Sequence, residues 1–212
     1  MNASTQLLSL QGESGVIEAL LDKPLEIPAS QIRGTAVIAH PHPLYGGSMQ
    51  NKVVQTLARA FVQCGWRAVR FNFRGVGASD GAYDDGRGEL LDMVSVIEQT
   101  ALPGQALALA GFSFGAYVTS HALARTWGTR TIDKVVLVGV AASRFQVAAL
   151  PHDAHDATLV LHGEQDDTVE LLSVMDWARP QSLPVMVIPG VEHFFHGQLP
   201  LLKSLVMRHL RA

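Results

Sequence analysis

The chain has 212 residues, of which 48% are hydrophobic and 17% charged, and its formal net charge is −3 at pH 7. This composition is typical of a globular protein and excludes an intrinsically disordered chain. Because the balance is acidic and no run of Lys or Arg occurs, we expect neither a nucleic-acid partner nor an anionic membrane partner.

The length predicts a single domain over residues 1–212, and the sequence leaves open a monomer or a homodimer. The only cysteine, Cys64, allows no intramolecular disulfide and fits a reducing compartment. Residues 1–10 lack the basic and apolar regions of a signal peptide, and no window has the length of a membrane span. We therefore expect a cytoplasmic protein.

Hydrophobic patterning predicts an opening β-hairpin, in which residues 6–10 and 16–21 flank a glycine-containing turn. Continuous apolar runs then predict buried strands at 34–39, 68–73, 106–110, 135–140, 158–162 and 185–188. Apolar residues at helical spacing predict helices at 53–62, 90–97, 116–124 and 199–210. This alternation predicts an α/β fold, with a doubly wound, mostly parallel sheet, an antiparallel edge and helices on both faces. Function is then expected at the carboxyl ends of the strands.

The pentapeptide Gly111-Phe112-Ser113-Phe114-Gly115 lies between the predicted strand at 106–110 and the predicted helix at 116–124. Strand, Gly-x-Ser-x-Gly and helix form the context of a nucleophile elbow, in which a sharp turn exposes the serine hydroxyl. The pattern therefore predicts Ser113 as a catalytic nucleophile. The alternative is a glycine-rich turn with an idle serine, and the partners found further along the chain argue against it.

A serine nucleophile needs a histidine base and an orienting acid. In folds that carry a nucleophile elbow, these two residues follow the serine in the order acid, then histidine. Asp166 follows the strand at 158–162 and is the predicted acid, with Asp167 and Glu164 as rivals. His193 follows the strand at 185–188 and is the predicted base. Its rival, His196, is expected to begin the last helix and to point away from the serine.

A developing oxyanion needs two backbone N–H donors, one of which comes from the residue after the nucleophile, here Phe114. The other is expected from the loop after the strand at 34–39, where Pro41 and Pro43 have no N–H to offer. The remaining candidates are His42, Leu44 and Tyr45. The hydrolase pattern His-Gly-x-x-Gly, laid over residues 42–46, selects Leu44.

The loop between the predicted strands at 135–140 and 158–162 is too short for a large helical cap. We therefore expect an open site that accepts small or medium acyl groups, without activation by a lipid interface. The aromatic residues expected to line it are Tyr45, Phe145, Phe194 and Phe195.

Four segments of the chain resemble the α/β-hydrolase superfamily, and more narrowly the small bacterial predicted hydrolases related to dienelactone hydrolases. They are residues 40–47, 70–79, 111–115 and 192–195. The resemblance implies hydrolysis of carboxylic esters or thioesters through an acyl-serine, with a small-molecule substrate. Dienelactone hydrolases use a cysteine nucleophile where this chain has Ser113, so dienelactone is not implied. An acyltransferase with the same acyl-enzyme and a catalytically silent binding protein are the alternatives.

No cofactor or metal is expected. Residues 75–81 resemble a dinucleotide fingerprint, but their third glycine is one residue late and no acidic residue ends the next strand. The histidine pairs at 40 and 42 and at 152 and 155 lack the spacing of a known metal site. Arg74 is expected to form an internal ion pair in preference to binding a substrate carboxylate.

Overall fold

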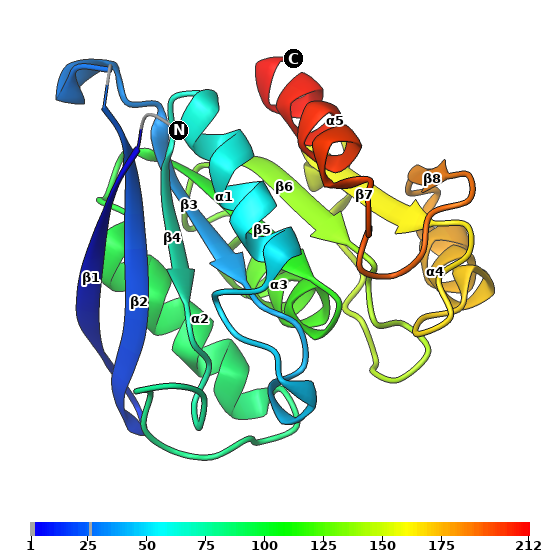
Figure 1. The fold of residues 1–212 in the computed structure, drawn as a ribbon, viewed down its shortest axis with the longest axis horizontal. Helices are drawn as coiled ribbons and strands as arrows, with labels where there is room; N and C mark the ends of the chain where they lie inside the picture. Colours follow the sequence, from blue (N-terminus) through cyan, green and yellow to red (C-terminus); the bar gives the residue numbers. More distant parts are fainter. Residues whose placement is uncertain (1–2, 26) are drawn as a thin grey trace.

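The computed structural model describes residues 3–25 and 27–212, and within them eight strands form one sheet, in the order β1-β2-β4-β3-β5-β6-β7-β8 (Figure 1). The strands are β1 (Ala3–Gly12), β2 (Gly15–Pro24), β3 (Gly34–Ala39), β4 (Arg67–Phe71), β5 (Ala106–Phe112), β6 (Ile132–Val138), β7 (Thr158–Gly163) and β8 (Val185–Ile188). β1 pairs antiparallel with β2, and β2 with β4, whereas every other neighbouring pair is parallel. The predicted α/β fold with an antiparallel edge is thus confirmed.

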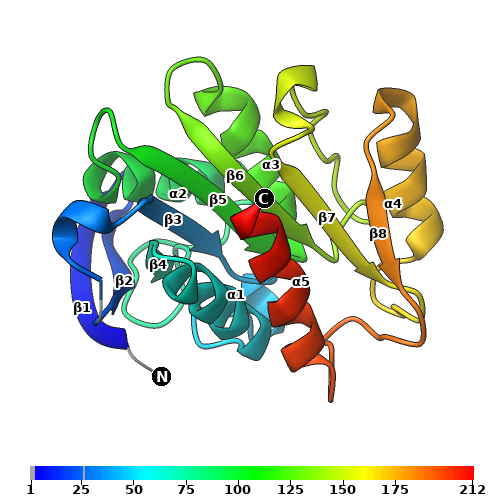
Figure 2. The same ribbon diagram turned by 90° about the horizontal axis from the view of Figure 1, so that it is seen from above.

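Helices cover both faces of the sheet, as Figure 2 shows. They are α1 (Lys52–Gln63), α2 (Arg87–Thr100), α3 (Phe114–Thr126), α4 (Leu171–Ala178) and α5 (Leu199–Arg211). α1 and α5 share one core with the sheet, whereas α2, α3 and α4 share the core on the other face. Because both faces are covered, a central strand such as β3 is buried along its whole length, and this explains its continuous apolar sequence.

Helix α4 is not among the helices predicted from the sequence. This helix has only eight residues and buries only Val174 and Ala178 against the core, so its apolar stripe is too short to stand out. β4 ends at Phe71, two residues before its predicted end. The backbone N–H of Asn72 still donates to Glu18 O of β2 over 2.8 Å, whereas that of Phe73 donates to the ring of His40 over 3.1 Å.

The segment between β6 and β7 contains only one short 3-10 helix, His152–Ala154. No helix among the described residues combines the length and the apolar character needed to cross a bilayer. The compact arrangement agrees with the expected absence of a large cap.

Two buried arginines join loops to the helices and strands: Arg74 joins its loop to α2, and Arg70 of β4 holds the loop at Met49. Arg74 donates to Asp92 over 2.8 Å, and this hydrogen bond raises the pKa of Arg74, so the arginine forms the internal ion pair that the sequence favoured. Arg70 donates to Asp22 over 2.9 Å and to the backbone oxygen of Met49 over 2.9 Å. Breaking a buried pair of this kind costs about 3–5 kcal/mol.

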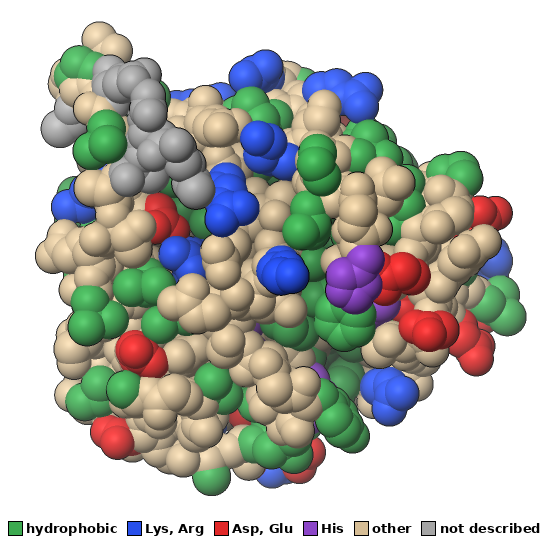
Figure 3. Space-filling view, in the orientation of Figure 1, with side chains coloured by type: hydrophobic (Ala, Val, Ile, Leu, Met, Phe, Trp, Pro, Cys, Tyr) green, Lys and Arg blue, Asp and Glu red, His purple; other side chains and the backbone are tan. Residues whose placement is uncertain are grey.

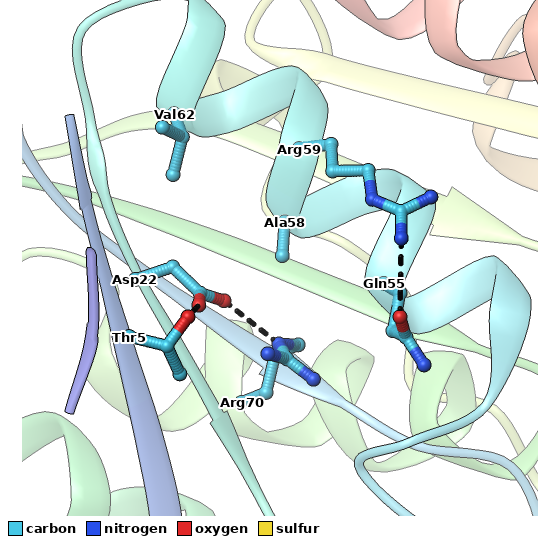
Figure 4. Close-up of a pocket in the computed structure, with 7 residues that line it drawn as sticks. All are labelled: Thr5, Asp22, Gln55, Ala58, Arg59, Val62 and Arg70. Carbon is cyan, nitrogen blue, oxygen red and sulfur yellow. Dashed lines mark hydrogen bonds and ion pairs between the residues drawn. The ribbon is translucent and has the colours of Figure 1, made fainter. Parts of the chain in front are cut away.

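The Arg70 pair borders a cavity of about 180 Å³ between β2, β4 and α1 (Figure 4). Its lining residues are Thr5, Asp22, Gln55, Ala58, Arg59, Val62 and Arg70. The Thr5 hydroxyl donates to Asp22 over 2.6 Å, so the carboxylate joins β1, β2 and β4. This cavity shares no lining residue with the one that contains Ser113.

Candidate active site

Ser113 occupies a sharp turn between β5 and α3. Its backbone has φ 57° and ψ −118°, a combination that costs a non-glycine residue about 1–3 kcal/mol. The strain is held in place partly by the Ser113 N–H, which donates to Val138 O over 2.8 Å. A Cβ on Gly115 would lie 2.5 Å from the backbone oxygen of Ala39, and one on Gly111 would lie 2.3 Å from that of Gly115. Both flanking glycines are therefore required by close backbone contacts.

The carboxyl ends of β5, β7 and β8 bring three side chains into one hydrogen-bonded chain. His193 Nε2 lies 3.1 Å from Ser113 Oγ, and His193 Nδ1 lies 2.6 Å from Asp166 Oδ2. All three residues are buried. The structure therefore brings together the three residues that the sequence predicted as nucleophile, base and acid.

Asp166 is held in the ionised form. Its Oδ1 accepts from the backbone N–H of Thr168 over 3.0 Å and of Val169 over 2.7 Å. Burial alone would raise its pKa, but the hydrogen bond and charge interaction with His193 and the Val169 N–H outweigh burial and lower the pKa. An ionised Asp166 fixes a proton on Nδ1 of His193 and leaves Nε2 free to accept from Ser113.

The alternative acids, Asp167 and Glu164, and the alternative base, His196, lie outside this hydrogen-bonded chain. Asp167 is exposed, and its carboxylate accepts from the hydroxyl of its neighbour Thr168. Glu164 accepts from the backbone N–H of Gly190 over 2.9 Å. His196 is exposed beside Glu192 and precedes α5 instead of beginning it. The structure joins none of these three side chains to Ser113 or His193 by a hydrogen bond.

His162, near the end of β7, lies next to Asp166 and is not among the site residues predicted from the sequence. Its Nε2 lies 3.0 Å from the backbone oxygen of Val169 and 3.6 Å from Asp166 Oδ2. Burial lowers the pKa of His162, so the ring is neutral and donates from Nε2. The sequence does carry a signal for this residue, because His162 is polar within an otherwise apolar strand and lies four positions before the predicted acid.

The loop after β3 contains the three N–H groups that the sequence left as candidates for the second oxyanion donor. The N–H of Leu44 donates to the ring of His42 over 3.2 Å, and the N–H of Tyr45 donates to His42 O over 3.2 Å. Within the described part of the chain, the N–H groups of His42 and Phe114 have no acceptor. His42 also lines the cavity that contains Ser113, and Leu44 does not. Of the three candidate N–H groups, only that of His42 has no acceptor among the described residues, and His42 lines the same cavity as Ser113.

The N–H of Leu44 is bonded because residues Pro43–Tyr45 form a 3-10 turn. The turn folds the following N–H groups back onto His42 and leaves its own N–H free. His40 holds the start of the loop: its ring accepts from Phe73 N–H over 3.1 Å and donates to Pro41 O over 2.6 Å. Burial lowers the pKa of His40 to about 4, so this donor and acceptor pattern persists at neutral pH.

Ser113 opens into a cavity of about 360 Å³, and Figure 3 shows histidine and hydrophobic surface around a hollow on this side of the molecule. Its lining residues are Pro41, His42, Tyr45, Gly46, Gly47, Asn51, Ser113, Ala141, Arg144, Thr168, Val169, His193 and Phe194. Tyr45 and Phe194 thus line the cavity as expected from sequence.

Phe145 and Phe195 do not line this cavity, contrary to expectation. Phe145 stacks on Tyr117 at a ring distance of 4.8 Å and contacts Phe114 and His42 from behind the wall. Phe195 is fully buried in the core shared with α5.

Among the residues that the structure describes, no cluster of His, Cys, Asp and Glu is arranged to hold a metal ion.

The profile of the alpha/beta hydrolase fold family matches residues 40–157. The chain belongs to this family. The match includes Ser113 but ends before Asp166 and His193, so the geometry of these two residues is independent of it.

Solved structures of other alpha/beta hydrolases resemble this one closely. A serine hydrolase without a lid from Xanthomonas campestris is 35% identical, with a TM-score of 0.86 over 98% of this chain and 94% of that one. An alpha-beta serine hydrolase homologue from Coxiella burnetii is 37% identical, with a TM-score of 0.79 over 97% of both chains.

The chain is also similar in sequence to an uncharacterized protein of Rickettsia prowazekii. The two are 32% identical over 180 residues, which cover 76% of this chain and 71% of that protein.

Proposed function

We propose that this alpha/beta hydrolase cleaves small to medium carboxylic esters or thioesters through an acyl-serine intermediate. The observation that supports this most strongly is the unbroken chain of contacts from Ser113 Oγ to His193 Nε2 and from His193 Nδ1 to Asp166 Oδ2. In this proposal Ser113 is the nucleophile, His193 the general base and acid, and Asp166 the residue that orients His193.

In the acylation step, Ser113 Oγ attacks the carbonyl carbon of the ester while its proton passes to Nε2 of His193. The carbonyl oxygen becomes an oxyanion, which the N–H groups of Phe114 and His42 stabilise. Each such donor contributes on the order of 10²–10³ to turnover. His193 then gives its proton to the departing alcohol or thiol, and the acyl group remains on Ser113.

In the deacylation step, a water molecule takes the place of the leaving group. His193 removes its proton while the water oxygen attacks the acyl carbon, and the second oxyanion occupies the same site. Collapse of this intermediate returns the proton to Ser113 Oγ and releases the acid. Asp166 remains ionised throughout and stabilises His193 while it carries the positive charge.

The size of the substrate follows from the cavity. A volume of about 360 Å³ lies at the low end of the range for small-molecule sites, which is about 300–1,000 Å³. Tyr45 and Phe194 in its wall are 79% and 41% exposed, so the site is open to water. An open cavity of this size favours short acyl chains over long ones.

A fluorophosphonate probe tests the proposed nucleophile without knowledge of the substrate. We expect it to add once to the purified protein, as read by intact mass, and not to Ser113→Ala or His193→Ala. Ser173→Ala and His196→Ala are matched controls, because Ser173 is only partly buried, His196 is exposed and both lie outside the cavity, and they should label as wild type does. An unlabelled wild-type protein would refute the proposal. With labelling established, a series of 4-nitrophenyl esters and acyl thioesters of increasing length tests the substrate class.

A further inference from the structure

Arg144 is the only Asp, Glu, Lys or Arg side chain that lines the active-site cavity among the described residues. It lies in the loop between β6 and β7 and is exposed. Four other described arginines pair with carboxylates: Arg70 and Arg74 with buried ones, and Arg87 and Arg179 with exposed ones. Within residues 3–25 and 27–212, the guanidinium of Arg144 has no carboxylate partner and no hydrogen-bond acceptor.

An adjoining cavity of about 340 Å³ is also lined, among the described residues, by a single cation that has no carboxylate partner. It shares Gly46, Asn51 and Phe194 with the active-site cavity. Lys52 is its only lining Lys, Arg, Asp or Glu among the described residues, and no carboxylate pairs with it there. In the described part of the chain, the Lys and Arg side chains that line the two cavities are therefore both without a carboxylate partner, although the whole chain carries a net charge of −3.

The charge of Arg144 acts on the place where the oxyanion forms. The pKa of His42 is lowered first by burial and next by the positive charge of Arg144. Asp85 acts in the opposite direction but more weakly, and it does not line the cavity. Since His42 carries the free N–H of the oxyanion site, Arg144 makes the potential there more positive.

We propose that the substrate carries a carboxylate, which the guanidinium of Arg144 binds while the ester carbonyl lies at Ser113. This inference rests on the proposed ester hydrolysis and names its substrate class. A guanidinium presents several N–H donors in a plane and suits two carboxylate oxygens. An unpaired arginine that lines the same cavity as the nucleophile thus selects esters by charge, whereas the aromatic wall selects them by size.

The test compares anionic and neutral esters that react at the same kind of bond. On the acyl side, 4-nitrophenyl hydrogen glutarate is compared with 4-nitrophenyl pentanoate. On the alcohol side, 4-acetoxybenzoate is compared with phenyl acetate. The measured quantity is the ratio of kcat/KM for the anionic ester to that for its neutral partner. We expect Arg144→Gln to lower this ratio about tenfold or more in one of the two arms, mainly through KM.

Two further variants separate recognition from general charge. Arg144→Lys keeps the charge and should retain part of the preference. Arg125→Gln removes an equal charge from an exposed position near the end of α3, outside the cavity, and should leave the ratio unchanged. An unchanged ratio for Arg144→Gln in both arms, or an equal fall for Arg125→Gln, would overturn the inference.

Failure of the proposed hydrolysis is distinguishable, since then wild type would cleave the neutral esters no faster than Ser113→Ala does. In that case binding of glutaramate to Ser113→Ala, followed by NMR titration with pentanamide as the neutral control, tests Arg144 by itself. We expect Arg144→Gln in the Ser113→Ala background to weaken glutaramate binding about tenfold and to leave pentanamide binding less affected. Equal glutaramate affinities for the two proteins would overturn the inference.

Discussion

The change Asp166→Asn keeps the size of the side chain and removes its negative charge. In the native protein, Oδ1 of Asp166 accepts from the N–H groups of Thr168 and Val169, and Oδ2 lies 2.6 Å from His193 Nδ1. The two N–H groups will hold the asparagine carbonyl in the place of Oδ1, so the amide NH₂ will face His193. His193 must then carry its proton on Nε2, where it can no longer accept the proton of Ser113.

We therefore expect kcat to fall by about 10⁴ for Asp166→Asn, or about 5 kcal/mol of transition-state stabilisation, as the equivalent change does in serine proteases. The assay is hydrolysis of 4-nitrophenyl acetate, with the rate of fluorophosphonate labelling as a second measurement. Asp167→Asn is the matched control, because this carboxylate is exposed and bonds only to Thr168. A variant that keeps more than about a tenth of the wild-type kcat would refute the assigned role.

Two other outcomes follow from the loop after β3. His42→Pro removes the backbone N–H with little change of backbone shape, because φ of His42 is −53° and proline prefers about −65°. We expect kcat to fall by about 10²–10³, whereas His42→Ala, which loses the same ring but keeps the N–H, should fall much less in the same ester assay; a fully active His42→Pro enzyme would contradict the assignment. Burial lowers the pKa of His40 from 6.5 to about 4, so in that window the unfolded chain binds a proton that the folded one does not. The free energy of unfolding should therefore fall by up to about 3 kcal/mol from pH 7 to pH 4 in urea titrations, and less in His40→Gln; equal pH slopes would exclude His40 as the cause.

Much of the fold could be predicted from the sequence because burial leaves a direct trace in the residue pattern. A strand covered by helices on both faces must be apolar throughout, and the run at Gly34–Ala39 is buried at every position. The exposed side of α4 carries no such requirement. Its two buried residues, Val174 and Ala178, produce one helical repeat, and one repeat does not distinguish a helix from a loop.

The three side chains of the candidate active site were predictable for a different reason. In a parallel sheet the carboxyl ends of the strands lie at one edge, so polar residues just after separate strands come together without any knowledge of distances. Ser113, Asp166 and His193 each follow a strand in this way. The choice of Asp166 over Asp167 rested on position alone, and the structure supplies the physical reason. A turn bonded to Oδ1 buries one carboxylate and leaves its neighbour in water.

The oxyanion donor and the cavity wall depend on backbone geometry that residue types do not encode. Any residue except proline has an N–H, so its identity says nothing about whether that group is free. In this loop the turn at Pro43–Tyr45 satisfies the groups at Leu44 and Tyr45 and leaves His42 available. Phe145 shows the same limit for side chains, because a ring near the site can stack on Tyr117 behind the wall. The cation in the wall is likewise visible only after folding, because Arg144 differs from the paired arginines in what surrounds it and not in residue type. Chemistry carried by side chains at strand ends is therefore visible in the sequence, whereas donors and specificity residues set by loop shape require the structure.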